Sequence, residues 1–411
     1  MIDPAGLVAR TRPLAPAEVP DLLAVAGDDG MVFARGGVGF AGRGTALRVG
    51  RADVAAALDA IDRDDPVEQP GTGPTAFGAL PFLPGADTDL LVPQLLVGID
   101  PEGRAWATTV SPSDTDADPH AALAEVLAGP GRPSPADGPS SFTVTAARPP
   151  AEWQAAVATA TARIRSGELD KVVLAREVTV TADAPLSVST ILLRLSQHHP
   201  GCYLYLVDGY CGASPELLVS RTGDVVRAQP MAGTKPRRGD PEADALLAEE
   251  LLASTTYRHE HQVTIDAVHD TLLAFSSYVD YEPVPSVVPL ANVVHLATRV
   301  EGRLSHPPAS ILELVDALHP TPAVCGRPRN AALAVIAELE ELDRGRYAGA
   351  VGWVDAAGNG EWAVAIRGAE IDGPVARVIA GNGMVGDSDP PTELIETRAK
   401  LQAMLSAIVR P

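Results

Sequence analysis

The 411-residue sequence is poor in the features that proteins use to bind membranes and nucleic acids. No apolar run approaches the roughly 18 residues needed to span a bilayer, since even the stretch at 89–99 is interrupted by Pro93 and Gln94. Aromatic residues make up only 4% of the chain, which disfavours stacking on single-stranded bases. Acidic residues outnumber basic ones by 53 to 32, and the net charge of −21 repels phosphate backbones and anionic lipids. The sequence therefore predicts a protein that binds neither nucleic acid nor membranes.

Cysteine is also scarce. Cys202, Cys211 and Cys325 form neither a CxxC pair nor a Cys/His spacing typical of zinc sites, and their odd number disfavours a disulfide framework. The N-terminus carries an acid at Asp3 and only a short apolar stretch, so it does not resemble a signal peptide. These features predict a protein of the reducing cytoplasm.

The remaining composition is that of a globular protein, with 46% apolar and 21% charged residues. At about 150 residues per domain, the length allows two or three domains or one large one. Residues 1–150 alternate short apolar runs with Gly and Pro turns, which predicts mostly strands, with a Pro-rich surface stretch near 111–150 that one helix interrupts. We expect residues 1–150 to form the β-rich N-terminal part of the same fold as residues 151–411.

Local patterns place the further elements. Spacing, caps and turn residues predict a helix at 151–164, a strand from Lys171, a helix beginning at Asp240 with 258–275 as a candidate continuation, a helix at 329–342, a hairpin over 348–371 and a final helix at about 391–409. Hairpins with helices grouped between them indicate the α+β class, with large antiparallel sheets and helices around them, and not a βαβ repeat.

Three motifs suggest other chemistries and are interpreted as chance matches. Two GxGxxG matches, at 37–42 and 381–386, lack the prompt helix that a dinucleotide fingerprint needs. His259 and His261 would point about 200° apart on a helix and cannot share a zinc ion. The sequence GYCGA around Cys211 lacks the final Gly of a nucleophile elbow. A nucleotide-dependent oxidoreductase and a Cys or Ser hydrolase are therefore disfavoured.

Lys171 and Glu216 are candidates for proton transfer. Lys171 opens a strand and shares one face with Val173 and Ala175. It either marks a solvated strand end or lies in an apolar cleft, where desolvation favours a neutral amine that can take a proton from water. Glu216 stands between a proline and an apolar run. It is either an exposed turn residue or a buried carboxyl group that stays protonated and acts as a general acid.

Glu393 and Glu396 are candidate metal ligands, because they lie at i and i+3 of the final helix and share one face. Two interpretations stay open. The face is solvated, with Glu396 paired to Lys400, or the carboxylates converge with Glu260 on a divalent cation. Mg²⁺ prefers such oxygen ligands and keeps coordination positions for substrate oxygens.

Arg367 stands in a predicted strand that is otherwise made of small and apolar residues. A guanidinium group in such a place is costly unless it meets an anion, and a carboxylate is its natural bidentate partner. That carboxylate belongs either to an internal Asp or Glu or to a ligand.

Taken together, these segments resemble the chorismate-binding enzymes, which include anthranilate synthase component I, aminodeoxychorismate synthase, salicylate synthase and isochorismate synthase. The resemblance covers Phe77 to the C-terminus and is strongest from Gly167 onward. It rests on KVVLAR (171–176), GASPELL (212–218), MAGTKPR (231–237), RHEH (258–261), HLAT (295–298), LHPTPAVCG (318–326), AVGWVDAAGNGEWAVAIR (350–367), AGNGMV (380–385) and ELIET (393–397). It implies an anthranilate synthase component I-like fold.

The resemblance also implies roles in catalysis and metal binding. Lys171 matches the general base that activates water for attack on ring carbon 2, and Glu216 matches the acid that protonates the departing 4-hydroxyl. Glu260 and Glu396 match the ligands of a Mg²⁺ cofactor, with Glu393 adjacent to them.

Substrate-binding roles follow in the same way. Arg367 and the backbone around Gly381 and Gly383 match the clamp on the enolpyruvyl carboxylate. Further matched positions line the substrate pocket: Gly233, Thr234, His295, Ala323 and Tyr347.

Lys171 distinguishes activities within the family. The resemblance implies attack by ammonia where this lysine is missing, and attack by water or covalent chemistry where it is present. We therefore expect a Mg²⁺-dependent isochorismate synthase, an isomerase that acts on chorismate. Salicylate synthase and a non-catalytic chorismate-binding protein stay as alternatives.

Other properties implied by the resemblance are less specific. We expect a monomer with no glutamine amidotransferase partner, and either siderophore or menaquinone biosynthesis as the pathway. Two positions depart from the family pattern: Asn382 stands where GAG is common, and Lys235 stands where Arg or Ala is frequent. Neither departure removes a catalytic group.

Overall fold

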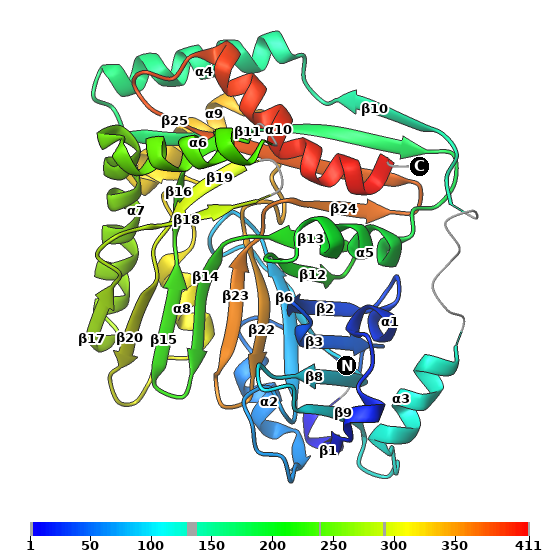
Figure 1. Cartoon of the computed structure of the whole chain (residues 1–411). Helices are drawn as coiled ribbons and strands as arrows, with labels where there is room; N and C mark the ends of the chain where they lie inside the picture. Colours follow the sequence, from blue (N-terminus) through cyan, green and yellow to red (C-terminus); the bar gives the residue numbers. More distant parts are fainter. Residues whose placement is uncertain (1–2, 130–137, 238–239, 291–292, 410–411) are drawn as a thin grey trace.

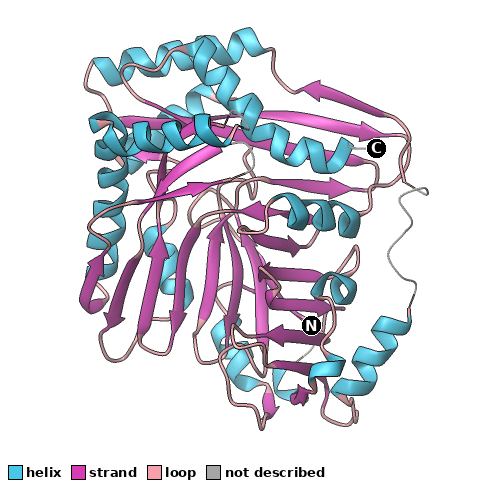
Figure 2. Cartoon of the chain, viewed as in Figure 1, coloured by secondary structure: helices cyan, strands magenta, loops and turns pink. Residues whose placement is uncertain are grey.

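The computed structural model describes residues 3–129, 138–237, 240–290 and 293–409. Within these ranges it leaves out the side chains of Thr234, Pro236, Pro241, Thr256 and Glu260. Figures 1 and 2 show large β-sheets with helices packed along them. In the described part of the chain, no helix is both long enough and apolar enough to cross a membrane.

The first sheet has thirteen strands and is antiparallel except for the parallel pair of β1 with β5. In spatial order its strands are β10 (Phe142–Ala146), β11 (Lys171–Ala182), β25 (Val375–Met384), β24 (Gly368–Asp372), β13 (Tyr210–Ser214), β12 (Tyr203–Val207), β2 (Met31–Arg35), β3 (Val38–Arg43), β8 (Leu95–Ile99), β9 (Ala105–Pro112), β1 (Leu7–Leu14) and β5 (Asp62–Asp64), with β21 (Gly326–Arg327) paired to β11.

Two further sheets complete the β structure. The second sheet has, in order, β17 (Ser276–Tyr281), β20 (Val300–Leu304), β15 (Val225–Gln229), β14 (Leu217–Thr222), β23 (Gly360–Val364), β22 (Ala350–Asp355), β6 (Thr75–Leu80), β7 (Asp89–Val92) and β4 (Leu47–Gly50). The third sheet consists of β16 (Met231–Pro236), β19 (Val293–Ala297) and β18 (Ser286–Pro289).

Strands from residues 1–150 lie in the same sheets as strands from the rest of the chain. β2 pairs with β12 in the first sheet, and β6 pairs with β22 over the whole length of both strands in the second. Each of the two large sheets is therefore built from both parts of the sequence.

The helices are η1 (Pro4–Gly6), η2 (Pro16–Glu18), α1 (Leu22–Ala26), α2 (Val54–Ala60), α3 (Pro119–Ala128), α4 (Pro150–Arg165), α5 (Val188–His198), α6 (Pro241–Ala253), α7 (Thr255–Leu273), α8 (Ile311–Leu318), α9 (Arg329–Leu339) and α10 (Pro390–Val409). Apolar side chains of α1, α3, α5 and α10 form one core cluster with the first sheet.

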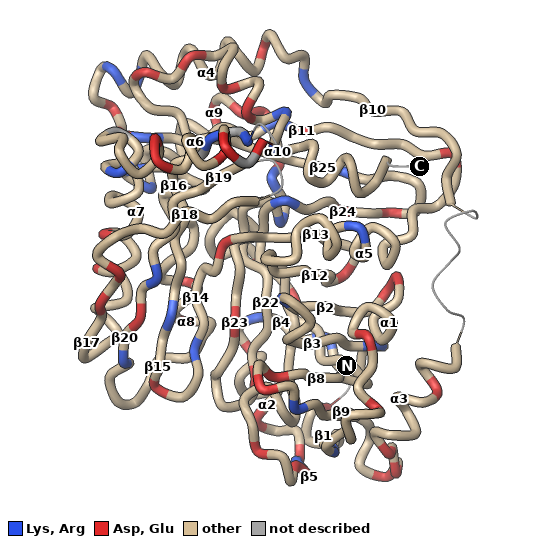
Figure 3. Tube along the Cα trace, in the orientation of Figure 1, with Lys and Arg blue, Asp and Glu red and all other residues tan. Residues whose placement is uncertain are grey.

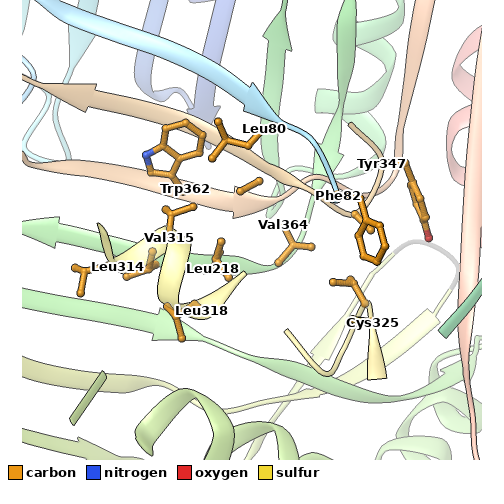
Figure 4. Close-up of a cluster of buried hydrophobic side chains, with 14 of the residues drawn as sticks. Leu80, Phe82, Leu218, Leu314, Val315, Leu318, Cys325, Tyr347, Trp362 and Val364 are labelled. Carbon is orange, nitrogen blue, oxygen red and sulfur yellow. The ribbon is translucent and has the colours of Figure 1, made fainter. Parts of the chain in front are cut away.

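Two more core regions lie between and below the large sheets. Aromatic side chains fill the space between the sheets, where the rings of Phe40 and Trp353 lie 4.7 Å apart. On the other face of the second sheet, α8 covers Leu218 and Trp362, and the cluster continues through Phe82 toward Tyr347 (Figure 4). This core supports the cavity described below.

The structure confirms the predicted α+β class with large antiparallel sheets. Asp240 caps α6 as predicted, because its carboxylate accepts a hydrogen bond from Ala243 N at 2.8 Å. The candidate continuation is a separate helix, since Ser254 is extended and caps α7 by accepting from Tyr257 N at 3.4 Å. The Pro-rich stretch contains the expected helix, α3, and a strand that the sequence did not predict, β10.

Candidate active site

Three chain crossings between sheets meet at one place and enclose a cavity. β13 continues through Pro215 and Glu216 into β14, and β23 returns through residues 365–367 to β24. β15 leads through Pro230 into β16 of the third sheet. The cavity has a volume of about 480 Å³ and is closed by the start of β11, the end of β25 and the N-terminal half of α10.

Eleven of the thirteen residues predicted for the site line this cavity: Lys171, Glu216, Gly233, His295, Ala323, Tyr347, Arg367, Gly381, Gly383, Glu393 and Glu396. The side chains of the other two, Thr234 and Glu260, lie outside the described part of the structure. Their backbone is placed. Thr234 pairs with His295 between β16 and β19, and position 260 lies about one turn after Tyr257, which lines the cavity from α7.

Glu216 is buried in the cavity wall, with 5% of its surface exposed. Its backbone is held at the crossing, because Val364 N donates to the Glu216 carbonyl at 3.0 Å. Burial raises the pKa of the carboxyl group to about 8, although a hydrogen bond with the Met231 backbone and the charge of Lys171 act in the opposite direction. The carboxyl group is therefore protonated at neutral pH, and the alternative of an exposed turn residue is wrong.

Lys171 is 8% exposed and lies in the same wall, so the alternative of a solvated strand end is wrong. The strand start is held on the β21 side, where Lys171 pairs with Arg327 and Val173 N donates to the Cys325 carbonyl at 2.8 Å. The charge of Lys171 acts on the Glu216 carboxyl group, so the two groups interact electrostatically within one cavity.

A buried ion pair supports the start of β11 from behind the wall. Glu340 accepts a hydrogen bond from Ala175 N at 2.7 Å and pairs with Arg344. Arg344 in turn donates to the carbonyls of Val173 at 2.8 Å and Val324 at 2.9 Å. Both charged side chains are at most 2% exposed, so the pair rigidly joins β11 to the segment before β21.

The prediction that Arg367 lies in a strand is wrong. Its backbone is left-handed, with a φ of +57°, in the crossing between β23 and β24. The hydroxyl groups of Tyr205 and Tyr210 hold this crossing by donating to the carbonyls of Ile366 and Ala365, both at 3.0 Å. The prediction failed because the mostly apolar sequence continues without interruption from β23 in the second sheet to β24 in the first.

The guanidinium group of Arg367 lines the cavity. Among the described residues, no carboxylate oxygen lies within 4.0 Å of its nitrogen atoms, which is the distance limit for an ion pair. Burial lowers the pKa of Arg367, which reflects the cost of its charge in this place. The sequence left two partners open for Arg367, an internal Asp or Glu and the carboxylate of a ligand. The described part of the chain supplies no internal carboxylate, so the guanidinium group is suited to bind an anionic ligand.

Tyr347, His295 and Gly381 form a neutral, closely packed part of the wall. Burial raises the pKa of Tyr347 to about 12 and lowers that of His295 well below its ordinary value, so neither side chain is charged at neutral pH. A Cβ atom at Gly381 would approach the Leu174 carbonyl to 2.9 Å and the Tyr347 hydroxyl to 3.2 Å. Glycine at 381 therefore lets the end of β25 approach its neighbours closely.

Glu393 and Glu396 face the cavity from α10, beside Lys400. The predicted pair of Glu396 with Lys400 is present, with 2.8 Å between Oε1 and Nζ. Its side chains are only 22% and 14% exposed, so the pair lies in the cavity wall and not on a solvated face. Burial, together with the charge of Glu396, raises the pKa of Glu393.

Two of the three predicted metal ligands, Glu393 and Glu396, line the cavity. Within the described residues, no three His, Cys, Asp or Glu side chains are grouped so that they could hold a metal ion. The side chain of the third predicted ligand, Glu260, is not among those that the structure describes. Two oxygen-donor groups next to a single ammonium group nevertheless suit a hard divalent cation, which would offset the repulsion between them.

Several wall residues escaped the sequence analysis, among them Tyr257 and Ser388, and Lys400 was recognised only as a partner of Glu396. Tyr257 was open to prediction, because it precedes Glu260 by three residues and shares its helix face. Ser388 precedes Asp389, which caps α10 by accepting from Thr392 N at 3.1 Å. No local signal links that cap to the cavity.

Comparison with known proteins places the chain in a family. The model of the family described as "Chorismate binding enzyme" matches residues 45–409. The chain belongs to the chorismate-binding enzymes. Isochorismate synthase DhbC of Bacillus subtilis is 42% identical to this chorismate-binding enzyme over 270 residues, which cover 63% of this chain and 68% of DhbC.

Solved structures share the fold of this chorismate-binding enzyme. MenF, the menaquinone-specific isochorismate synthase of Escherichia coli, superposes with a TM-score of 0.83 at 26% identity, covering 97% of this chain and 95% of MenF. Anthranilate synthase component I of Streptococcus pneumoniae has a TM-score of 0.72 at 24% identity, covering 90% and 92% of the two chains. The predicted family and its fold are confirmed.

Proposed function

We propose that this enzyme is an isochorismate synthase, an isomerase that converts chorismate to isochorismate. The observation that carries the proposal is the joint burial of Lys171 and the protonated Glu216 in one cavity. The same cavity is lined by the guanidinium of Arg367, which has no ion-pair partner within the described part of the chain. The names of the relatives DhbC and MenF support the same activity.

The reaction needs one proton acceptor and one proton donor. Lys171 takes a proton from a water molecule that attacks ring carbon 2. Glu216 gives its proton to the 4-hydroxyl, which leaves as water while the ring double bonds shift. One water enters and one leaves, so substrate and product are isomers. Hydroxide is a poor leaving group, which explains the need for a buried, protonated acid.

Charge complementarity supports the choice of substrate. Chorismate carries two carboxylates, and Arg367 together with the backbone at Gly381 and Gly383 binds that of the enolpyruvyl group. Gly233, His295, Ala323 and Tyr347 line the cavity and would surround the ring, and we expect Thr234 to join them.

The acidic side of the cavity requires a cation before it can accept the ring carboxylate. Glu396 and Glu393 from α10, with Glu260 from α7, would hold Mg²⁺. The bound ion would supply positive charge that reverses the local field for an anionic substrate. Lys400 alone balances only one of the two carboxylates on α10.

Incubation with chorismate and Mg²⁺, followed by separation of the products, tests the activity. We expect isochorismate to accumulate. Salicylate and pyruvate as the main products would instead identify a salicylate synthase, and binding of chorismate without turnover would identify a non-catalytic protein. The cytoplasmic location, the monomeric state and the lack of an amidotransferase partner stay predictions.

A further inference from the structure

Asn382 lies between Gly381 and Gly383 near the end of β25, and its side chain is turned toward α10. It is 1% exposed. Its amide nitrogen donates to the Glu393 carboxylate at 3.0 Å and to the Glu393 carbonyl at 3.2 Å. Its amide oxygen accepts a hydrogen bond from Lys400 Nζ. One buried amide therefore contacts both a carboxylate and an ammonium group of the cavity wall.

The contacts of Lys400 divide its charge among several acceptors. Besides the Asn382 oxygen, Lys400 Nζ donates to the Gly381 carbonyl at 3.1 Å and pairs with Glu396 at 2.8 Å. Among the described residues, no ion pair within 4.0 Å joins Lys400 to Glu393. The ammonium group is thus held on one of the two carboxylates, although both stand on the same face of α10.

The orientation of the amide explains this division. Its oxygen end faces the cation and its nitrogen end faces the anion, so both charged groups are satisfied without meeting each other. If the amide were missing, Lys400 could bridge both carboxylates. Glu393 would lose one of the donors to its carboxylate and would keep the hydrogen bond with the Ser388 side chain. A bridging ammonium group would compete with any divalent cation for the same oxygens.

We propose that Asn382 is a positioning residue of the cation site, which holds Lys400 away from Glu393 and so sets the affinity of the enzyme for Mg²⁺. This inference rests on the proposed function, because it takes Glu393 and Glu396 as Mg²⁺ ligands. Asn382 is not one of the residues that line the cavity, and it acts through these carboxylates.

Calorimetric titration of Mg²⁺ into the protein without chorismate tests the proposal. We expect Asn382→Ala to raise the Kd for Mg²⁺ roughly tenfold or more, as changes to outer-shell partners of metal ligands do. The Mg²⁺ concentration for half-maximal rate should rise in parallel, while kcat and the KM for chorismate at saturating Mg²⁺ change little. If Asn382 had a purely structural role, its replacement would change kcat and the KM for chorismate along with the Kd for Mg²⁺.

Val378→Ala is the matched control, because Val378 is a buried residue of the same strand that packs in the apolar core and not against the carboxylates. It should lower the melting temperature and leave the Kd for Mg²⁺ unchanged. If Asn382→Ala does not fold, Asn382→Leu fills the space without the hydrogen bonds and should show the same weakened binding.

Two results would overturn the inference in different ways. An unchanged Kd in a folded Asn382 variant would reject the role of Asn382 while leaving the metal site intact. If the unaltered protein took up no Mg²⁺ at all, the metal site of the proposed function would fail, and the role of Asn382 with it.

Discussion

At the scale of single residues, the burial of Glu216 should make the rate depend on pH if this residue is the proposed general acid. Because its pKa is about 8, the proton that the leaving hydroxyl needs is present at pH 7 and is lost as the pH rises through 8. We expect kcat to fall about tenfold per pH unit above that value. A profile of kcat from pH 6 to 10 in saturating chorismate measures this limb.

The variant Glu216→Gln is the control for that assignment. It keeps the size of the side chain but cannot give up a proton, so kcat should drop by roughly a hundredfold to ten-thousandfold. The remaining rate should no longer fall through pH 8. A rate in the unaltered enzyme that stays flat to pH 10 would contradict Glu216 as the general acid.

Replacement of Arg367 should weaken substrate binding without lowering the stability of the protein. We proposed that Arg367 binds a carboxylate of the substrate. Replacing it with Leu would remove these charge-assisted hydrogen bonds, which are worth about 1.5–3 kcal/mol, so kcat/KM should fall roughly tenfold to a hundredfold. The melting temperature should not fall, because the variant also removes a buried charge that has no ion-pair partner among the described residues.

The conservative variant Arg367→Lys separates charge from geometry. Lysine keeps the charge but lacks the planar fork that fits a carboxylate, so its kcat/KM should lie between those of the unaltered enzyme and Arg367→Leu. Unchanged kinetics together with a lower melting temperature in Arg367→Leu would mean that the residue is structural.

At the scale of elements, the crossings depend on two glycines that face each other, Gly212 on β13 and Gly368 on β24. A Cβ atom at Gly368 would lie 2.0 Å from the Tyr205 hydroxyl and 2.7 Å from the Cys211 carbonyl. Gly368→Ala should therefore destabilise the protein by about 3 kcal/mol, measured by urea unfolding. Gly201→Ala is the control, since a Cβ atom there meets nothing within 4 Å.

Combining Gly368→Ala with Tyr205→Phe tests the cause. The second change removes the hydroxyl group, so the double variant should lose less stability than the sum of the single losses. Recovery should be partial, because the Cys211 carbonyl stays too close. Simple additivity would show that the Tyr205 hydroxyl is not the obstacle.

The elements also show why sequence patterns succeed in some places and fail in others. The caps at Asp240 and the helical spacing after residue 150 act within one or two turns, so α6 and α4 were predictable. The position of Arg367 was not, because a crossing between sheets depends on contacts with Tyr205 and Tyr210 more than 150 residues away. The strand β10 was missed for a similar reason, since its pairing partner β11 defines it.

At the scale of the whole molecule, residues 1–150 should not be separable from the rest. Removing them would expose the inner strands β12 and β22, which lose their partners β2 and β6. We expect residues 151–411 alone to show no cooperative thermal transition by circular dichroism, whereas the full chain unfolds in one.

Addition of residues 1–150 as a separate chain is the control, because it offers the missing strands and should restore some of the native signal. A fragment 151–411 that unfolds cooperatively near the melting temperature of the full chain would contradict this prediction and would mean that the catalytic part is an independent domain.

The net charge also has its explanation at this scale. Acidic residues are spread over most helices and strand ends (Figure 3), so the surplus is mainly distributed and does not mark one binding surface. A few carboxylates are different, because Glu393 and Glu396 face a cavity together. Total charge indicated which partners to exclude, but the sign of the ligand depends on where individual charges lie.

The sequence by itself determined the family, the α+β class and eleven of the residues that line the cavity, since these follow from local patterns and from motifs in order. Only the tertiary structure decided how those residues behave. It buried Glu216 and so kept its proton, left Arg367 without an ion-pair partner in the described chain, and placed Asn382 between Glu393 and Lys400. The reason is physical: protonation and pairing depend on desolvation and on neighbours brought from distant parts of the chain, which no local pattern contains.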